Sequence, residues 1–206
     1  LLSLLKGDIH IDNITANNLD ANLYTDSIGV LNIQFLIDAL TPKEKQQTPD
    51  LIFPIITLNN ASFKYTNYSI PTQNLKEWQF NVNDIAVDSL FTQIQFSLTN
   101  QSNLDANINY LNFKEKSGFR LSHLSTCVKL TDSSFVSPFA NIKLPNTHLI
   151  TDSIAILLTR NNENRVDWAK TKFKFNILKA DLQLSDLKHF VPEFEHLKKH
   201  ASASAK

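Results

Sequence analysis

Apolar and polar residues alternate along much of this chain, and the alternation changes phase at short polar pairs. In PIITLNNASFKY, at positions 54 to 65, the apolar positions are even before Asn59-Asn60 and odd after that pair. Alternation with a period of two is typical of a β-strand with one buried face. A two-residue hairpin or a β-bulge would each produce the change of phase. The sequence leaves both open, and both keep the apolar side chains on one face of a sheet.

The same change of phase recurs at irregular intervals, which indicates a degenerate internal repeat. The other pairs are Asp12-Asn13, Asn83-Asp84, Pro145-Asn146 and, more loosely, Leu178-Lys179. Further alternating runs begin at Ile94, Ala106, Phe119 and Ile154, with Tyr110 assigned to the run that starts at Ala106. We therefore predict a mainly all-β fold through residues 50 to 183, an elongated, curled antiparallel sheet with one apolar face.

Two stretches have helical rather than strand periodicity. Apolar residues at helical spacing predict a helix near residues 32 to 40, with Asn32 as its N-cap, followed by a linker at 41 to 50. A second helical segment is predicted at 184 to 199, with Ser185 as N-cap and Pro192 dividing it into two pieces. The resulting organisation is a repeat-built β segment over 1 to 183, a helical segment over 184 to 199, and a linker or tail over 200 to 206.

Composition excludes several classes of function. The chain has 206 residues, of which 42% are hydrophobic, and its 20 basic and 20 acidic residues give a formal net charge of zero. A neutral chain has no overall field to attract nucleic acid, so no nucleic-acid partner is expected. One cysteine allows neither an internal disulfide nor a thiolate zinc site, and three glycines allow no phosphate-binding loop. Because the sequence begins without Met, we expect it to be part of a longer protein.

Candidates for chemistry each have a simpler structural interpretation. His196, His200 and Glu193 could share a helical face and bind a metal, but a solvated helix end is the simpler interpretation. Cys127 near His123 lacks an orienting carboxylate, so a packed side chain is expected there. Trp78 and Trp168 could stack on sugars, although isolated tryptophans in strands usually pack. We therefore predict no catalytic residue, metal or cofactor, and no enzyme.

The apolar face is the remaining functional feature. Few helices are available to cover it, so it is either filled as the core of a sandwich or barrel, or left as an open trough for acyl chains. Periodicity alone does not choose between these. The candidate groove residues are Ile56, Leu58, Phe63, Phe80, Val82, Ile85, Val87, Ile94, Phe96, Ile142, Leu144, Phe173 and Phe175.

Five segments together resemble the N-terminal half of TamB-like proteins of the AsmA superfamily, in the form found in Bacteroidetes. They are LNIQFLIDALTPKEK (31 to 45), IITLNNASFKY (55 to 65), FKEKSGFRLSHLS (113 to 125), IKLPNTHLITDSI (142 to 154) and LQLSDLKHFVPEF (182 to 194). The resemblance implies a taco-shaped β-sheet with a hydrophobic groove, in a periplasmic, envelope-spanning protein anchored in the inner membrane.

The functions implied by the resemblance are of two kinds. The first is transport of phospholipids, whose acyl chains occupy the groove, between the inner and outer membranes. The second is a scaffold for outer-membrane protein assembly that binds client β-strands; a plain structural or carbohydrate-binding module is a further alternative. The chain shows neither the anchor helix nor the C-terminal domain of such proteins, so any outer-membrane β-barrel partner is expected to bind regions outside it.

Three Asp-Ser dipeptides precede an apolar residue. Asp26-Ser27-Ile28, Asp88-Ser89-Leu90 and Asp152-Ser153-Ile154 look like the acceptor sequence for O-glycosylation of exported Bacteroidetes proteins. The same dipeptide is also common at turns and strand ends, where the Asp side chain bonds to the nearby backbone. Ser27, Ser89 and Ser153 are therefore candidate modification sites with a structural alternative.

Overall fold

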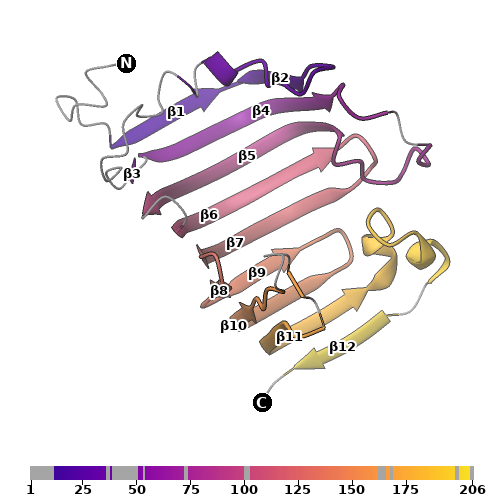
Figure 1. Cartoon of the computed structure of the whole chain (residues 1–206). Helices are drawn as coiled ribbons and strands as arrows, with labels where there is room; N and C mark the ends of the chain where they lie inside the picture. The colour runs from indigo at the N-terminus through magenta and orange to yellow at the C-terminus, as the bar shows by residue number, and fades with distance from the viewer. Residues whose placement is uncertain are drawn as a thin grey trace.

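The chain folds as one large mixed β-sheet. The structure is a computed structural model and describes residues 12–35, 38, 51–52, 54–71, 74–99, 103–161, 166–167, 169–197 and 200–204. Figure 1 shows the sheet face on, with β1 at one end of the strand order and β12 at the other. The all-β prediction is confirmed. The strands are β1 (Asn13–Asn17), β2 (Asp20–Thr25), β3 (Leu51–Ile52), β4 (Ile55–Asn67), β5 (Asp84–Thr99), β6 (Asn103–Glu115), β7 (Arg120–Leu130), β8 (Ser134–Ser137), β9 (Ala140–Lys143), β10 (His148–Leu157), β11 (Lys172–Gln183) and β12 (His200–Ser204).

The centre of the sheet is antiparallel and one edge is parallel. Strands β4 to β7 form a meander, β8 and β9 both bridge β7 to β10, and β11 and β12 complete the C-terminal edge. At the other edge β1 and β2 both pair with β4 in parallel. The antiparallel pairing predicted for residues 50 to 183 is confirmed, since the described strands β3 to β12 pair with one another in this way. The parallel pairs involve only β1 and β2, which precede that range, because the long connection after β2 returns the chain to the end of the sheet where β1 began.

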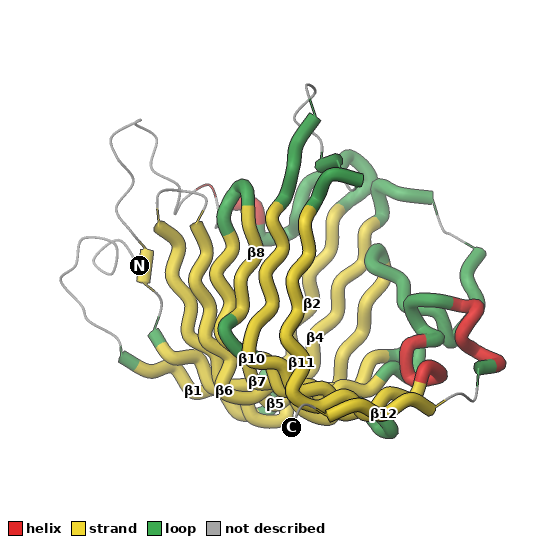
Figure 2. Tube along the Cα trace, turned by 90° about the horizontal axis from the view of Figure 1, so that it is seen from below, coloured by secondary structure: helices red, strands yellow, loops and turns green. Residues whose placement is uncertain are grey.

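Each of the six longest strands contains one extra residue relative to its neighbours. Register shifts place these β-bulges between Leu58 and Ala61 in β4 and at Asp88–Ser89 in β5. Those of the other strands lie at Asn109 in β6, between Leu121 and Leu124 in β7, at Asp152 in β10 and at Leu178 in β11. Bulges bend a strand and increase its twist. Figure 2 shows the result: the strands bend part way along and the sheet is curled.

Both structures considered for the polar pairs occur. Asn60 has a φ of +55°, and β4 continues through Asn59-Asn60 as a bulged strand. Leu178 is likewise a bulge within β11. Pro145-Asn146 instead forms the turn of the β9–β10 hairpin, closed by the N–H of Leu144, which donates to the carbonyl of Thr147. The bulge and the hairpin differ only in whether the chain reverses, which the local alternation does not encode.

Two of the predicted pairs differ from expectation. Asn83 lies in a turn and Asp84 begins β5, so Phe80 and Val82 precede the strand instead of lying in it. Before Asp12-Asn13, residues 1 to 11 lie outside the described residues, and β1 starts at Asn13. The sheet therefore begins later at both positions than the alternation predicts.

The helical predictions hold in part. Gln34, Phe35 and Asp38 are helical, and Asn32 and Ile33 form a turn before them, whereas residues 36, 37, 39 and 40 and the 41 to 50 linker lie outside the described residues. The Asn32 side chain bonds to β2, since its oxygen accepts the N–H of Tyr24 and its amide donates to the carbonyl of Asn22.

The C-terminal helical segment consists of two short 3₁₀ helices, η1 (Leu184–Leu187) and η2 (Pro192–His196). Pro192 divides them as predicted, but Ser185 lies inside η1 and is not its N-cap. The prediction of a plain tail over 200 to 206 is also wrong, because His200–Ser204 pairs with β11 as β12.

The sheet has no second layer within the described residues. Only five hydrophobic residues there are buried, three of them alanines, whereas 21 large hydrophobic side chains are exposed. A sandwich or closed barrel would bury its large apolar residues in the opposite proportion. None of the helices in the described part of the chain has the length and apolar character to span a bilayer.

Candidate functional site

Cross-strand pairing defines one face of the curled sheet, which we call the apolar face. Residues directly opposite each other in a ladder point to the same side of a sheet, so the registers assign each side chain to a face. This face carries Ile14, Ala16, Ala21, Leu23, Ile56, Leu58, Phe63, Tyr65, Ile85, Val87, Ile94, Phe96, Ala106, Ile108, Leu111, Phe113, Leu124, Val128, Phe135, Ile142, Leu149, Ile154, Ile156, Phe173, Phe175 and Ile177.

The bulges preserve the apolar face on both sides of the bend. Leu58 pairs with Thr92 on one side of the β4 bulge, and Phe63 pairs with Val87 on the other. The two sides are linked through β6, where Leu111 pairs with Thr92 and Glu115 pairs with Val87. Leu111 and Glu115 are four residues apart in β6, and the register shifts between them come from extra residues in β5 and β7, not in β6. All these side chains therefore share one face. The prediction that the changes of phase keep one apolar face is confirmed at Asn59-Asn60, Pro145-Asn146 and Leu178-Lys179.

The predicted groove residues mostly lie together on this face. Ile56, Leu58, Phe63, Ile85, Val87, Ile94, Phe96, Ile142, Phe173 and Phe175 are on the apolar face, and Leu144 follows directly after β9 and is buried. Phe80 and Val82 are outside the strands. Phe80 packs at one end of the sheet, as described below, and Val82 is 64% exposed in the turn before β5. These two are therefore wrong as residues of the sheet face.

Small residues occupy the apolar face along the bend. Ala61, Thr92, Thr126, Ala140, Thr151 and Ala180 are each 7% exposed or less, and each lies on its strand within a few residues of a bulge or of the β8–β9 break. We call them the spine. In a one-layer sheet such burial requires the two parts of the sheet on either side of the bend to converge over it, which leaves room only for small side chains. The apolar face is therefore the inner face of the curl.

Two spine hydroxyls bond to carbonyls next to the irregularities. Thr92 donates to the carbonyl of Tyr110, beside the β6 bulge, over 3.0 Å, and Thr126 donates to that of Phe139 over 2.8 Å. A bulge interrupts the ladder and leaves backbone groups to be paired otherwise. Threonine thus fits the bend by its size and also by its hydroxyl group.

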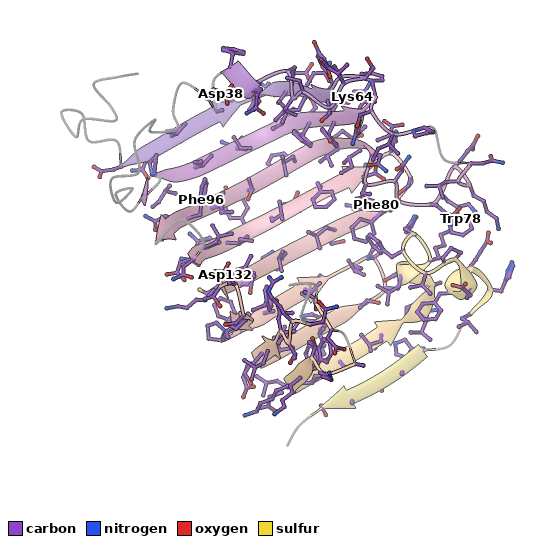
Figure 3. All side chains as sticks on the ribbon, in the orientation of Figure 1. Asp38, Lys64, Trp78, Phe80, Phe96 and Asp132 are labelled. Atoms are coloured by element: carbon purple, nitrogen blue, oxygen red, sulfur yellow. The ribbon has the colours of Figure 1, made fainter. Side chains whose placement is uncertain are left out.

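An aromatic cluster packs on one end of the apolar face. The ring of Phe190 lies 4.9 Å from Phe119 and 5.2 Å from Phe80 between centroids, and Phe119 contacts Phe113 on β6. The N–H of Phe80 also donates to the carbonyl of His189. These contacts join the β4–β5 connection to the segment after β11. Figure 3 shows Phe80 and Trp78 at the end of the sheet opposite Phe96, so this cluster leaves the middle and far parts of the face uncovered.

The two faces differ sharply in charge. Among the strand residues that the structure describes, Glu115 is the one charged side chain on the apolar face, and it is 3% exposed at the clustered end. Its carboxylate accepts the N–H groups of Ser117 and Ala86, so it is fully engaged in local bonding. The opposite face, which we call the polar face, carries the lysines of β4, β6, β7, β9 and β11. An apolar surface without free charge suits hydrocarbon and not a polar substrate.

The residues considered for catalysis or metal binding do not assemble into such a site. His200 lies in β12 beside Asp181, while His196 lies in η2, so the shared helical face is wrong. No group of three or more His, Cys, Asp or Glu in the described ranges could hold a metal ion. Cys127 donates to the amide oxygen of Asn107 on the polar face.

His148 and the tryptophans have structural surroundings. Burial, then the charges of Lys179 and Lys143, lowers the pKa of His148 below its ordinary value of 6.5, and the ring bonds to Asn141. Trp78 is half-buried, with the Lys76 ammonium 4.9 Å from its ring centroid. Trp168 lies outside the described residues.

The three Asp-Ser dipeptides occupy turns and bulges. Asp26 accepts the N–H groups of Ile28 and Val30 and so shapes the exposed turn that contains Ser27. Ser89 is the exposed bulge residue of β5, with a φ of +51°, and Ser153 follows the bulge residue of β10. Each dipeptide thus has a structural role, and modification of the serines stays a prediction.

The alternating runs of the sequence do not include the whole of this face. The run assigned to Ala106, Ile108 and Tyr110 breaks at Asn109, which places Tyr110 on the polar face opposite Gln93. Leu111 and Phe113 then take the apolar positions, and Leu124 and Phe135 were also overlooked. The shift of apolar residues from odd to even positions between Val87 and Leu90 could have revealed one further bulge.

Comparison of the chain with protein-family models, curated proteins and solved structures gives no match.

Proposed function

We propose that the apolar face binds the acyl chains of phospholipids, and that the chain is a segment of a periplasmic, envelope-spanning protein of the TamB and AsmA type that conducts phospholipids between the inner and outer membranes. The observation that carries the proposal is the one-layer sheet: its inner face is apolar and nearly free of charge, and it has no covering layer among the described residues. Monomeric soluble proteins rarely leave so extended an apolar surface open.

The surface has the properties that acyl-chain binding requires. Hydrocarbon is bound through buried apolar area, at about 25 cal/mol per Å², without directional contacts. For acyl chains to move along such a face, it needs large apolar side chains at every second position and no polar site that would bind the lipid tightly. The apolar face provides Phe, Ile and Leu on strands β4 to β11 around a narrow spine. No proton transfer or metal is needed for this function.

The assembly-scaffold alternative uses a different surface. Client strands would add to a free sheet edge through backbone hydrogen bonds, and the outer edge of Lys172 to Leu178 in β11 has no strand partner within the described residues. A lipid function depends on the face of the sheet, whereas a client-strand function depends on its edge. Crosslinks placed on the two surfaces therefore separate the two functions.

Bound lipid provides the first test. The purified chain is extracted with organic solvent, and the extract is analysed by mass spectrometry. We expect about one phospholipid molecule per chain or more, because the apolar face would otherwise contact water. An extract without lipid, from protein prepared without detergent, would refute the proposal.

A photocrosslinker on each face gives a sharper test. Phe96 lies on the apolar face and its neighbour Gln95 on the polar face of the same strand. A photoreactive amino acid at position 96 is expected to capture lipid, and the same residue at position 95 is not. Equal lipid capture at both positions would indicate nonspecific adsorption, and capture of protein alone at position 96 would favour the scaffold function.

A further inference from the structure

The C-terminal part of the sheet has an open edge next to the apolar face. β11 pairs with β10 along most of its length, but β12 pairs only with Lys179–Gln183. No strand of the described chain pairs with the outer edge of residues 172 to 178. A molecule at this edge can therefore contact both faces of the sheet.

The open part of β11 carries aromatic residues on one face and lysines on the other. Phe173 and Phe175 lie on the apolar face, are 52% and 53% exposed, and stack with 6.4 Å between ring centroids. Lys172 and Lys174 alternate with them, and both are exposed on the polar face. Such an edge matches an amphiphile whose hydrocarbon contacts one face while its polar group reaches round to the other.

The two lysines are available to an external anion. Neither makes an ion pair in the described part of the chain, and their ladder partners on β10 are Leu157 and Ala155. The nearest carboxylate on that strand, Asp152, accepts a hydrogen bond from the side chain of Asn176. An ammonium without a protein partner beside an apolar surface favours binding of a phosphate-bearing group.

The opposite edge of the sheet lacks these charges. Its strands β1 and β2, NITAN and DANLYT, contain no lysine or arginine. Their polar-face residues are asparagine, threonine, aspartate and tyrosine. Of these two edges, only the open edge of β11 therefore carries lysines.

We infer that the open edge of β11 is a headgroup site for anionic phospholipids, with the phosphate held by Lys172 and Lys174 and the adjoining acyl chain on Phe173 and Phe175. This inference rests on the proposed lipid function and adds a preference for anionic lipid at a defined place.

The test compares short-chain phosphatidylglycerol with phosphatidylcholine of identical acyl chains, below their micelle concentrations, on the full chain. At low salt the wild type is expected to bind phosphatidylglycerol about tenfold more tightly. The variant Lys172→Gln/Lys174→Gln is expected to lose this preference and to keep its Kd for phosphatidylcholine. The matched control Lys64→Gln/Lys114→Gln removes the same charge from the polar face of β4 and β6 and keeps the preference.

Each contrary outcome has a distinct meaning. Equal Kd values for the two lipids in the wild type, or a preference unchanged in Lys172→Gln/Lys174→Gln, would overturn the headgroup site and leave the lipid function standing. Binding of neither lipid would overturn both. Glycerol phosphate binding as tightly as the lipid would show a simple anion site and also overturn the inference. Tenfold higher salt should reduce the preference, because exposed charges are screened.

Discussion

Asn60 offers the sharpest test of how the sheet is bent. It is the bulge residue of β4, its φ of +55° lies in the left-handed region, and its side-chain amide donates to the side-chain oxygen of Asn18 over 2.8 Å. Its neighbour Asn59 makes an equivalent bond to Asn17, over 2.9 Å, and is not among the residues with positive φ. The two positions therefore separate the backbone contribution from the hydrogen bond.

The magnitudes follow from these two terms. An exposed hydrogen bond between side chains contributes about 0.5–1 kcal/mol, so Asn59→Ala should lower the free energy of unfolding by that amount. Asn60→Ala also replaces asparagine, whose short polar side chain makes the left-handed region tolerable, by a residue that bears the full cost of positive φ, which adds up to about 1–2 kcal/mol. Asn60→Gly loses the bond but adopts this φ without strain, so its free energy of unfolding should fall by only about 1 kcal/mol. The wild type is expected to be the most stable, Asn59→Ala and Asn60→Gly to be less stable by similar amounts, and Asn60→Ala to be the least stable.

Urea denaturation followed by circular dichroism measures these differences as shifts in the transition midpoint, provided that the slope m is unchanged. Equal destabilisation by Asn60→Ala and Asn60→Gly would refute the assignment of Asn60 as a left-handed bulge residue. Destabilisation by Asn59→Ala as large as that of Asn60→Ala would show that the amide bonds, and not the backbone conformation, hold the bend.

Three further predictions concern the spine, the apolar face and the polar face. Ala140→Leu should lower the free energy of unfolding by about 1–3 kcal/mol, because the bend has no room for the larger side chain. In the same urea titration the control Ala155→Leu, on the polar face, should change the free energy of unfolding by less than about 0.5 kcal/mol. Phe96→Asp should keep the circular dichroism spectrum but lose copurified lipid, with Gln95→Asp as the control; normal lipid content in Phe96→Asp would contradict the groove assignment. Because the pKa of His148 is lowered in the fold, the unfolded chain binds its proton more readily, so stability should fall as the pH drops below 6.5. His148→Gln should remove this part of the pH dependence, and an unchanged profile would exclude His148 as its source.

Much of the apolar face could be predicted from local patterns. Side chains alternate across a strand, so Ile56, Leu58 and Phe63 were assigned to one face before any pairing was known, and the registers place them there. The assignment was wrong at Phe80 and Val82, where a strand-like pattern lies in a turn instead, and at Tyr110, where an extra residue reverses the face. Bulges escape detection when the inserted residue, such as Asn109, is followed by a residue that also suits a strand.

The sequence by itself determined that the chain forms strands and that these strands share one apolar face, because the period-two pattern depends only on backbone geometry within each strand. Only the tertiary structure decided that Asn59-Asn60 bends a strand whereas Pro145-Asn146 reverses one. It also decided that β1 and β2 pair in parallel, that His200–Ser204 adds a strand, and that the bulges align into one bend lined by Ala and Thr. These features depend on hydrogen bonds between segments far apart in the chain, and a pattern local to one segment carries no information about the strand that lies beside it.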